Sequence, residues 1–299
     1  MRRRLLLLCS GQGGQHAGMF ELARTHPRAR ALLDQFDLVV DPALLFSNRL
    51  AQPMIVACTL AMWEAIRDLV PAPALVAGYS IGEISAYSVA GILTPVDAVR
   101  LAHVRARLMD DCLKAAPGQA LAAVSGLSLQ TIEALMEGEG FFVAIETGAD
   151  NCVAGGPAAA LVSMAEKIAA AGGKMCRLNV EIASHTPYMA PAVAHFAHAL
   201  RATKLDSPKT LLLSSISAGT ISGTAMAIEH LSRQLAEKIK WMDCMDACAE
   251  AGLTVALELG PGSALARMLR VRQPSIDCRS VADFRSIAGI QKWLARHFE

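Results

Sequence analysis

The sequence predicts an α/β protein with a mostly parallel sheet and one inserted unit of different topology. Short apolar runs alternate with helical patterns along the first part of the chain, as expected for parallel strands joined by helices. Between residues 121 and 182 the expected order changes to βαββαβ, which is the split βαβ of a ferredoxin-like subdomain. We therefore expect a parallel-sheet domain from residues 1–120 and 183–299, and a small subdomain from 121–182.

The expected domain opens with four alternating elements. They are a strand over Leu5–Cys9, a helix over Met54–Val70, a strand over Ala74–Gly78 and a helix over Ile81–Ala90. The next helix has clear boundaries, because Thr94 can cap its start, Pro95 suits its first position and Pro117-Gly118 lies beyond its end. A further strand over Thr254–Leu259 leads into a glycine-rich turn.

The inserted unit contains four expected strands and two expected helices. In chain order they are a strand over Leu121–Ser125, a helix over Ser128–Met136, strands over Phe141–Glu146 and Asn151–Ala154, a helix over Pro157–Ala171, and a strand over Met175–Val180. Gly172-Gly173 directly follows the second helix and can end it before the last strand begins.

Composition excludes several classes of protein. At 53% hydrophobic residues the chain can bury a core, so a disordered protein is excluded. Its 28 Lys and Arg against 27 Asp and Glu leave no basic excess for nucleic acid. No stretch approaches the roughly 20 apolar residues of a membrane span, and Leu5–Cys9 is shorter than the core of a signal peptide. A cytoplasmic protein without a membrane partner is expected.

The eight cysteines are scattered, and no CxxC pair occurs among them. Most lie in apolar runs, which is typical of free thiols packed as small hydrophobic residues in a reducing compartment. Cys244 and Cys248 are one helical turn apart, but no second pair of ligands accompanies them. No metal site is therefore expected.

The segment Gly78-Tyr79-Ser80-Ile81-Gly82 has the Gly-x-Ser-x-Gly pattern between an expected strand and an expected helix. This is the context of a nucleophile elbow, in which the serine hydroxyl projects from the carboxyl edge of the sheet. The helix start behind it offers the Ile81 N–H to a developing oxyanion. The alternative is a glycine-rich turn with an inert serine.

A serine nucleophile needs a general base, and three histidines are candidates. His16 lies in a glycine loop, and His103 lies on the polar side of its helix. His185 lies at the junction between the last strand of the small subdomain and a helix that starts near Pro191. Sequence position alone favours none of them decisively.

Arg105 is a lone cation at the centre of an apolar helix face. At about 100° per residue, the side chains around it are Ala98, Leu101, Leu108, Met109 and Cys112. An unpaired guanidinium in such a place would cost several kcal/mol, so an anion must meet it. That anion is either a structural carboxylate, such as Glu83 or Glu258, or the carboxylate of a substrate.

A glycine loop, Ser10-Gly11-Gln12-Gly13-Gly14-Gln15, follows the first strand. It lacks the Gly-Lys-Ser/Thr ending of a phosphate-binding loop and the spacing of a dinucleotide motif. A backbone N–H from this loop could instead serve as a second oxyanion donor.

Taken in order, these motifs resemble the malonyl-CoA:acyl-carrier-protein transacylase family. The matching segments are Gly11-Gln12-Gly13-x-Gln15, Gly78-x-Ser80-x-Gly82-Glu83, Arg105, Ser184-His185, Gln234 with Trp241, and Glu258-Leu259-Gly260-Pro261-Gly262. The resemblance implies an α/β-hydrolase-like core with a ferredoxin-like insert. It also implies a ping-pong S-malonyltransferase with no bound cofactor, which uses malonyl-CoA and the phosphopantetheine-type thiol of an acyl carrier protein.

The resemblance also implies a role for each site residue. Ser80 would be acylated, and His185 would be its base. The backbone carbonyl of Gln234 would orient the histidine. The N–H groups of Gln12 and Ile81 would form the oxyanion hole, and Arg105 would bind the malonyl carboxylate.

Several positions depart from the commonest family pattern. Tyr79 replaces the usual histidine before the serine, and Ser10 replaces a proline. Lys238-Ile239 stands where Pro-Val is often found, and Glu146 stands where an asparagine is frequent. The Gly-Tyr-Ser-x-Gly-Glu form is most similar to the transacylase subunit of bacterial malonate decarboxylase, which implies the carrier subunit of that enzyme as acceptor and its other subunits as partners.

Three alternatives remain open at this stage. One is a malonyl transacylase of fatty-acid synthesis. A second is a serine thioesterase or esterase on the same core, which would need an acid such as Asp97, Asp110, Asp111 or Asp150. The third is a non-catalytic subunit that keeps the fold for docking.

Overall fold

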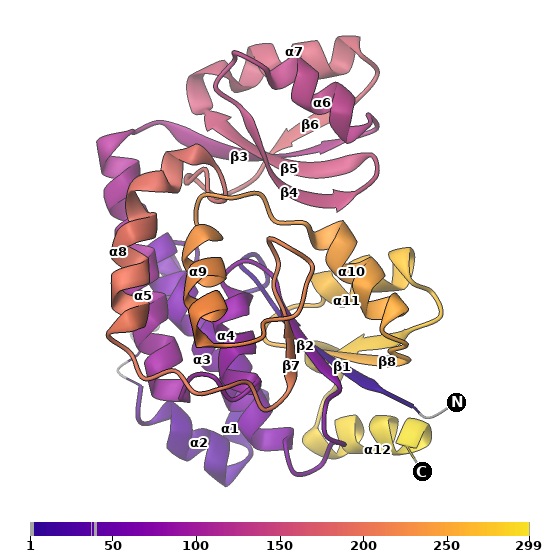
Figure 1. Cartoon of the computed structure of the whole chain (residues 1–299). Helices are drawn as coiled ribbons and strands as arrows, with labels where there is room; N and C mark the ends of the chain where they lie inside the picture. The colour runs from indigo at the N-terminus through magenta and orange to yellow at the C-terminus, as the bar shows by residue number, and fades with distance from the viewer. Residues whose placement is uncertain (1–2, 37, 39–40, 299) are drawn as a thin grey trace.

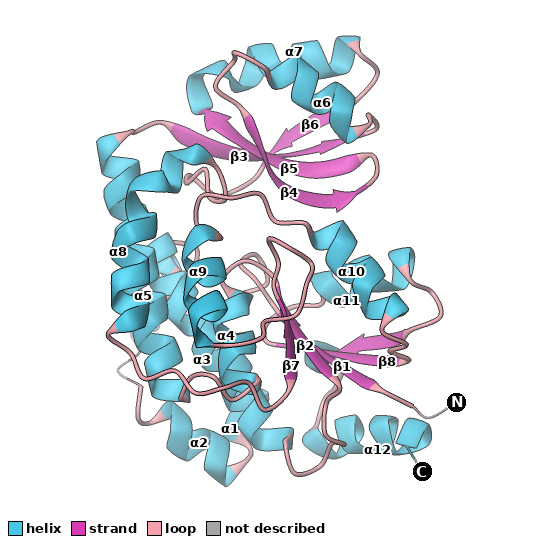
Figure 2. Ribbon diagram, in the orientation of Figure 1, coloured by secondary structure: helices cyan, strands magenta, loops and turns pink. Residues whose placement is uncertain are grey.

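The computed structural model describes residues 3–36, 38 and 41–298. These residues form two sheets, one parallel and one antiparallel, with helices packed on both (Figures 1 and 2). The predicted α/β fold class is confirmed.

The parallel sheet has the strand order β7-β2-β1-β8-β9, and all four neighbouring pairs are parallel. Its strands are β1 (Leu5–Cys9), β2 (Leu75–Gly78), β7 (Leu211–Leu213), β8 (Val255–Leu259) and β9 (Asp277–Ser280). The central strand β1 is buried along its whole length, which explains why its five residues are all apolar.

Alternate residues of β1 serve two separate cores. Leu5 and Leu7 pack into the larger core with helices on one face, and Leu6 and Leu8 pack into a second core on the other. The larger core draws on α1 (Glu21–Arg24), α2 (Pro27–Leu33), α3 (Asn48–Ile66), α4 (Gly82–Val89), α5 (Pro95–Ala115), α8 (Ala190–Arg201), α9 (Thr224–Arg233) and α12 (Ile287–Phe298). The second draws on α10 (Trp241–Glu250) and α11 (Ala264–Arg272).

The antiparallel sheet has the order β4-β5-β3-β6 and lies above the parallel sheet in the view of Figure 1. Its elements run in the order β3 (Gln119–Ser125), α6 (Leu129–Met136), β4 (Phe142–Gly148), β5 (Asn151–Pro157), α7 (Leu161–Ala170) and β6 (Lys174–Arg177). The helices α6 and α7 cover one face and close a third core. On the other face, Leu121 and Ile145 pack with α10 in the second core. The chain order is therefore βαββαβ, while the division at residues 120 and 182 stays a prediction.

Some element boundaries differ from the predictions. Helix α3 begins at Asn48 and carries Pro53 in its interior, whereas the prediction started after that proline. Strand β6 ends at Arg177, although Leu178 N–H still donates to Leu121 O across the sheet (2.8 Å). The edge strands β7 and β9 were not predicted, because three or four residues are too few to show a period of two.

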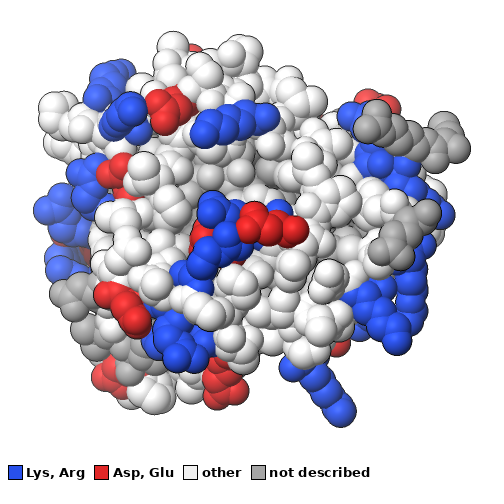
Figure 3. All heavy atoms as spheres, turned by 90° about the horizontal axis from the view of Figure 1, so that it is seen from below, with Lys and Arg blue, Asp and Glu red and all other residues white. Residues whose placement is uncertain are grey.

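The helices of the described residues and the distribution of surface charge bear on the predicted absence of a membrane span and of a basic surface. No helix in the described part of the chain is both long enough and apolar enough to cross a bilayer. On the face shown in Figure 3, acidic side chains lie among basic ones, in line with the formal net charge of +1.

Candidate active site

Ser80 lies on a sharp turn between β2 and α4. Its φ of 54° is in the left-handed region, which a side chain other than glycine rarely adopts. The turn brings α4 against the end of β1 so closely that a Cβ on Gly82 would collide with the carbonyl oxygens of Cys9 and Ser10. Glycine at position 82 is therefore required for the strained turn that presents Ser80.

His185 contacts Ser80 directly, and it is one of the three histidine candidates. Its Nε2 lies 2.7 Å from Ser80 Oγ, and its Nδ1 lies 2.6 Å from the backbone oxygen of Gln234. Because a carbonyl oxygen can only accept, Nδ1 carries the proton and donates to Gln234. Nε2 is then free to accept the hydroxyl proton of Ser80, which is the arrangement that a general base requires.

The surroundings of His185 keep its ring neutral. The residue is 1% exposed, and burial together with the positive charge of Arg105 lowers its pKa from 6.5 to about 3. The hydrogen bond to Gln234 O opposes that shift but is the smaller effect. The histidine is therefore in its basic form at neutral pH.

No aspartate orients His185 within the described part of the chain. The four candidates bond elsewhere: Asp97 to Thr94 and Arg100, Asp110 to Asn48, Asp111 to Lys114, and Asp150 to Asn151. The third group behind the Ser–His pair is a backbone carbonyl.

Arg105 is buried in α5 at 1% exposure, and its contacts are amides rather than carboxylates. Its Nη1 donates to Gln52 Oε1 (2.7 Å) and its Nη2 donates to Gln234 Oε1 (3.2 Å). Its Nε has no hydrogen-bond partner among the described residues. Burial lowers its pKa to about 10, which still leaves the guanidinium charged at neutral pH.

The expectation that a structural carboxylate might bind Arg105 directly is wrong for both candidates. Glu83 is reached only through Gln234, whose Nε2 donates to Glu83 Oε2 (2.7 Å) and to Ser80 O (2.9 Å). Glu83 also accepts from the hydroxyl of Ser215. Burial raises its pKa to about 7, against the opposing effect of these hydrogen bonds and of Arg105.

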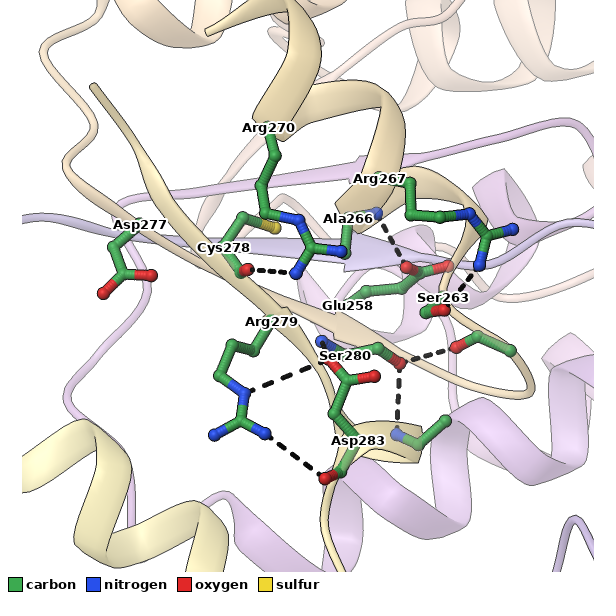
Figure 4. A network of polar contacts seen from close by, with 12 residues as sticks. Glu258, Ser263, Ala266, Arg267, Arg270, Asp277, Cys278, Arg279, Ser280 and Asp283 are labelled. Carbon is green, nitrogen blue, oxygen red and sulfur yellow. Dashed lines mark hydrogen bonds and ion pairs between the residues drawn. The ribbon is translucent and has the colours of Figure 1, made fainter. Parts of the chain in front are cut away.

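Glu258, the other candidate, belongs to β8, and its carboxylate points to the start of α11 (Figure 4). Its carboxylate accepts the N–H groups of Leu265 (3.3 Å) and Ala266 (2.8 Å), and also the hydroxyl of Ser10 (2.9 Å). These contacts satisfy the free N–H groups of the helix, so Glu258 has a structural role at the end of β8.

One candidate oxyanion donor, Ile81, lies in the elbow, and the other, Gln12, lies in the glycine loop after β1. Ile81 precedes the first residue of α4, and its N–H donates to no group of the described chain. The Gln12 N–H likewise donates to none, and its neighbour Gly11 lies so close to Tyr79 that a Cβ there would come within 2.7 Å of the ring and of the Tyr79 oxygen. The glycine loop is thus packed against the residue before Ser80, and both N–H groups remain available to an oxyanion.

A cavity of about 720 Å³ reaches His185 from the side of the antiparallel sheet. It is lined by residues of α6 and β4, by Pro187, and by Ala236 and Lys238 of the segment after α9. The cavity therefore gives access to His185, while Ser80 and Arg105 are not among the residues that line it.

Sequence reasoning missed Gln52 and Ser215. Gln52 is 1% exposed in α3 between apolar neighbours, so the argument applied to Arg105 would also have singled it out. Ser215 follows the short strand β7, and no local pattern distinguishes it from other serines.

Comparison with known proteins gives a family for the whole chain. A model of the acyl transferase domain matches residues 6–292. The chain is 30% identical over 303 residues to the malonyl CoA-acyl carrier protein transacylase of Mycobacterium bovis, covering 96% of this chain and all of the relative. It is also 30% identical to a phenolphthiocerol synthesis polyketide synthase of Mycobacterium marinum, of whose length it spans only 13%.

Solved structures agree with this likeness. A transacylase from Mycobacterium tuberculosis superimposes with a TM-score of 0.87 at 28% identity, covering 98% of this chain and all of that chain. The malonyl-CoA:acyl carrier protein transacylase of Xanthomonas oryzae gives a TM-score of 0.90 at 27% identity, covering 99% of each chain.

Proposed function

The chain belongs to the acyl transferase domain family, and from this premise we propose that it moves a malonyl group from malonyl-CoA to the thiol of an acyl carrier protein. The observation that carries the proposal is a hydrogen-bonded Ser80–His185 pair beside a buried Arg105 that has no carboxylate partner among the described residues. Full-length relatives named as malonyl CoA-acyl carrier protein transacylases support the same substrate.

The first half-reaction forms an ester on the enzyme. Ser80 Oγ attacks the thioester carbonyl carbon while its proton passes to His185 Nε2. The N–H groups of Gln12 and Ile81 hold the oxyanion of the tetrahedral intermediate. The intermediate collapses, the C–S bond breaks, and the CoA sulfur leaves with the proton held on Nε2.

The second half-reaction reverses these roles with a new thiol. His185 Nε2 takes the proton of the phosphopantetheine thiol, and the sulfur attacks the malonyl ester. Collapse of the second intermediate breaks the bond to Ser80 Oγ, which recovers its proton from Nε2. No bound cofactor is required, because Ser80 alone carries the acyl group between the two thiols.

Arg105 accounts for the choice of acyl group. Its remaining N–H donors can bind a carboxylate in a two-pronged contact, and a neutral acetyl chain would leave a buried guanidinium without an anion. The amides of Gln52 and Gln234 hold the guanidinium in place without neutralising its charge.

For the acceptor, the carrier subunit of malonate decarboxylase is proposed, supported by the Gly-Tyr-Ser-x-Gly-Glu form around Ser80. The carrier of fatty-acid synthesis is supported equally by the named relatives. Purified chain that has been loaded with malonyl groups can be offered each carrier in its thiol form, and the initial transfer rates then identify the preferred acceptor. A rate at least tenfold higher with the fatty-acid carrier would overturn the proposed acceptor.

The experiment that tests the function is intact-mass analysis after mixing the chain with malonyl-CoA or with acetyl-CoA. A malonyl adduct that maps to Ser80 is expected, with little adduct from acetyl-CoA, and Ser80→Ala should carry neither. Release of CoA without an adduct and without a carrier would point to a thioesterase instead. If neither an adduct nor free CoA appears, the proposed malonyl transfer from malonyl-CoA is refuted.

A further inference from the structure

Two departures from the usual family pattern, Glu146 and Lys238, meet in space although they lie far apart in the sequence. Lys238 Nζ lies 2.5 Å from Glu146 Oε1 on β4 and 2.9 Å from Glu133 Oε1 on α6. The side chain of Glu146 is 12% exposed, while that of Glu133 is 50% exposed. The contact with Glu146 is therefore the sheltered one, and the contact with Glu133 is open to water.

Lys238 belongs to a short segment, Leu235–Lys240, that connects α9 to α10; we call it the strap. Its far end is fastened to the edge strand of the antiparallel sheet. Ile239 N–H donates to Ala144 O (2.9 Å), and Glu146 N–H donates to Ile239 O (2.8 Å). These bonds make a parallel bridge between Ile145 and Ile239.

The near end of the strap holds the histidine. Leu235 O accepts the backbone N–H of His185 (2.8 Å), and the oxygen of Gln234, the residue before the strap, accepts from the His185 ring (2.6 Å). Only a few residues separate these two carbonyls from the bridge to β4. Any displacement of the strap would therefore move the groups that orient the ring.

We propose that the Lys238–Glu146 ion pair is a positioning device, which locks the strap to β4 and thereby fixes His185 toward Ser80. Lys238 and His185 both line the cavity described above, so the cation of the pair and the histidine face the same space. Two backbone hydrogen bonds on an edge strand can fray. A sheltered ion pair across the same bridge opposes that fraying. Lys238 is thus a positioning residue, and it acts through the strap on the catalytic histidine.

The inference rests on the proposed function only in taking Ser80 and His185 as the reacting pair, so its test avoids malonyl chemistry. A fluorophosphonate probe reacts with an activated serine: the bond from Ser80 Oγ to phosphorus forms, fluoride leaves, and the hydroxyl proton passes to His185 Nε2. Lys238→Met and Glu146→Gln should slow this labelling about tenfold or more, as expected when a catalytic group is misplaced. Lys238→Arg, which keeps the cation, should stay within about threefold of the unmodified chain.

Two matched controls come from the same unit. Glu133→Gln removes the exposed contact of the same ammonium, and Lys167→Met removes an ion pair with Glu139 (2.6 Å) that does not involve the strap. Both should label within about twofold of the unmodified chain, because exposed pairs contribute little. Labelling is measured well below the melting temperature of every variant, so that a loss of stability does not mimic a loss of reactivity.

A direct readout is the proton resonance of His185 Nδ1–H, which lies downfield while the proton is bonded to Gln234 O. We expect Lys238→Met to broaden or remove this signal and Lys238→Arg to keep it. The proposal is overturned if Lys238→Met lowers the melting temperature but leaves both the labelling rate and the signal unchanged. It is also overturned if Lys238→Met only raises the KM for malonyl-CoA, since Lys238 would then bind the donor. A chain that reacts with the probe but not with malonyl-CoA would refute the proposed function and leave the positioning role to be decided by the labelling rates.

Discussion

Arg105 is a buried cation, and no ion pair in the described chain neutralises its charge. At the scale of single residues, this charge influences the electrostatics of the site. Its two side-chain hydrogen bonds are to amide oxygens, which orient a guanidinium but leave its positive charge in place. The same charge lowers the pKa of His185 and opposes the rise in the pKa of Glu83. One residue therefore influences the pKa of the base and of the buried acid together, and the proposed function assigns it the acyl selectivity as well.

The first prediction concerns selectivity. Arg105→Ala should slow acylation by malonyl-CoA roughly 10- to 150-fold, which corresponds to losing a charge-assisted hydrogen bond of about 1.5–3 kcal/mol. The acetyl group has no carboxylate and therefore makes no such contact, so the ratio of the malonyl to the acetyl acylation rate should fall. Pre-steady-state acylation rates for both donors measure this. An unchanged ratio of malonyl to acetyl rates would exclude Arg105 from carboxylate binding.

The second prediction concerns the protonation of His185. Because its pKa is lowered to about 3, the ring should remain neutral as the pH falls from 8 to 5, where an exposed histidine with a pKa near 6.5 becomes charged. Arg105→Ala removes one cause of the lowering, so the pKa should rise in that variant. Titration of the ring nitrogens by NMR tests both statements. A midpoint near 6.5 in the unmodified chain would contradict them.

At the scale of elements, α5 and the elbow hold the reacting groups on rigid supports. Helix α5 extends from Pro95 to Ala115 and presents Arg105 from its middle, with α3 packed alongside to supply Gln52. The elbow joins β2 to α4 at the carboxyl edge of the parallel sheet. The sequence predicted both supports from local patterns. At α5 the capping pattern is confirmed, because Thr94 accepts the N–H of Asp97 (3.1 Å).

The third prediction separates the stability of α5 from the chemistry of Arg105. Thr94→Ala should lower the free energy of unfolding by about 1 kcal/mol, the usual contribution of such a cap. Thr94→Ser should retain most of it, because serine also accepts the N–H. Denaturant titration measures the change. The ratio of malonyl to acetyl acylation should stay the same in both variants, and a changed ratio would mean that the helix start influences the site.

At the scale of the whole molecule, Ser80 and His185 come from segments that follow two different sheets. Ser80 follows the parallel strand β2, while His185 follows the antiparallel sheet and is held by carbonyls of the segment between α9 and α10. Three hydrophobic cores support this arrangement, and the second of them joins β1 and α10 to residues of the antiparallel sheet. The relative position of the sheets therefore determines the distance between nucleophile and base.

The fourth prediction tests whether a reagent in solution can reach the cysteine side chains in these cores. Of the eight cysteines, Cys176 is exposed and the other seven are buried, and burial raises the pKa values of Cys58, Cys248 and Cys278 to about 12. A thiol reagent should modify about one thiol per folded chain and eight after denaturation. Cys176→Ser should abolish the fast reaction. Rapid modification of several thiols in the folded chain would show that the cores open readily.

Much of the fold and part of the site could be predicted without coordinates. The central strand β1, the nucleophile turn at Ser80, the capped helix α5 and the βαββαβ order all depend on signals within a few consecutive residues. The prediction that Glu83 or Glu258 might bind Arg105 was wrong, because the sign of a charge says nothing about which groups will pack against it. The partners are two glutamines, and they come from α3 and from the end of α9.

The sequence by itself determined the periodic elements, the turn that strains Ser80, and the presence of a cation on an apolar helix face. Those features follow from local sterics and from the hydrophobic period, which neighbouring residues encode. The carbonyl of Gln234 was expected at His185 only through the family resemblance, and no local pattern indicates it. The tertiary structure alone decided that the Gln234 side chain contacts Arg105 and Glu83, and that Lys238 meets Glu146. A backbone carbonyl looks the same at every position of a sequence. Contacts between residues about a hundred positions apart depend on how the two sheets pack, and no short stretch of sequence contains that information.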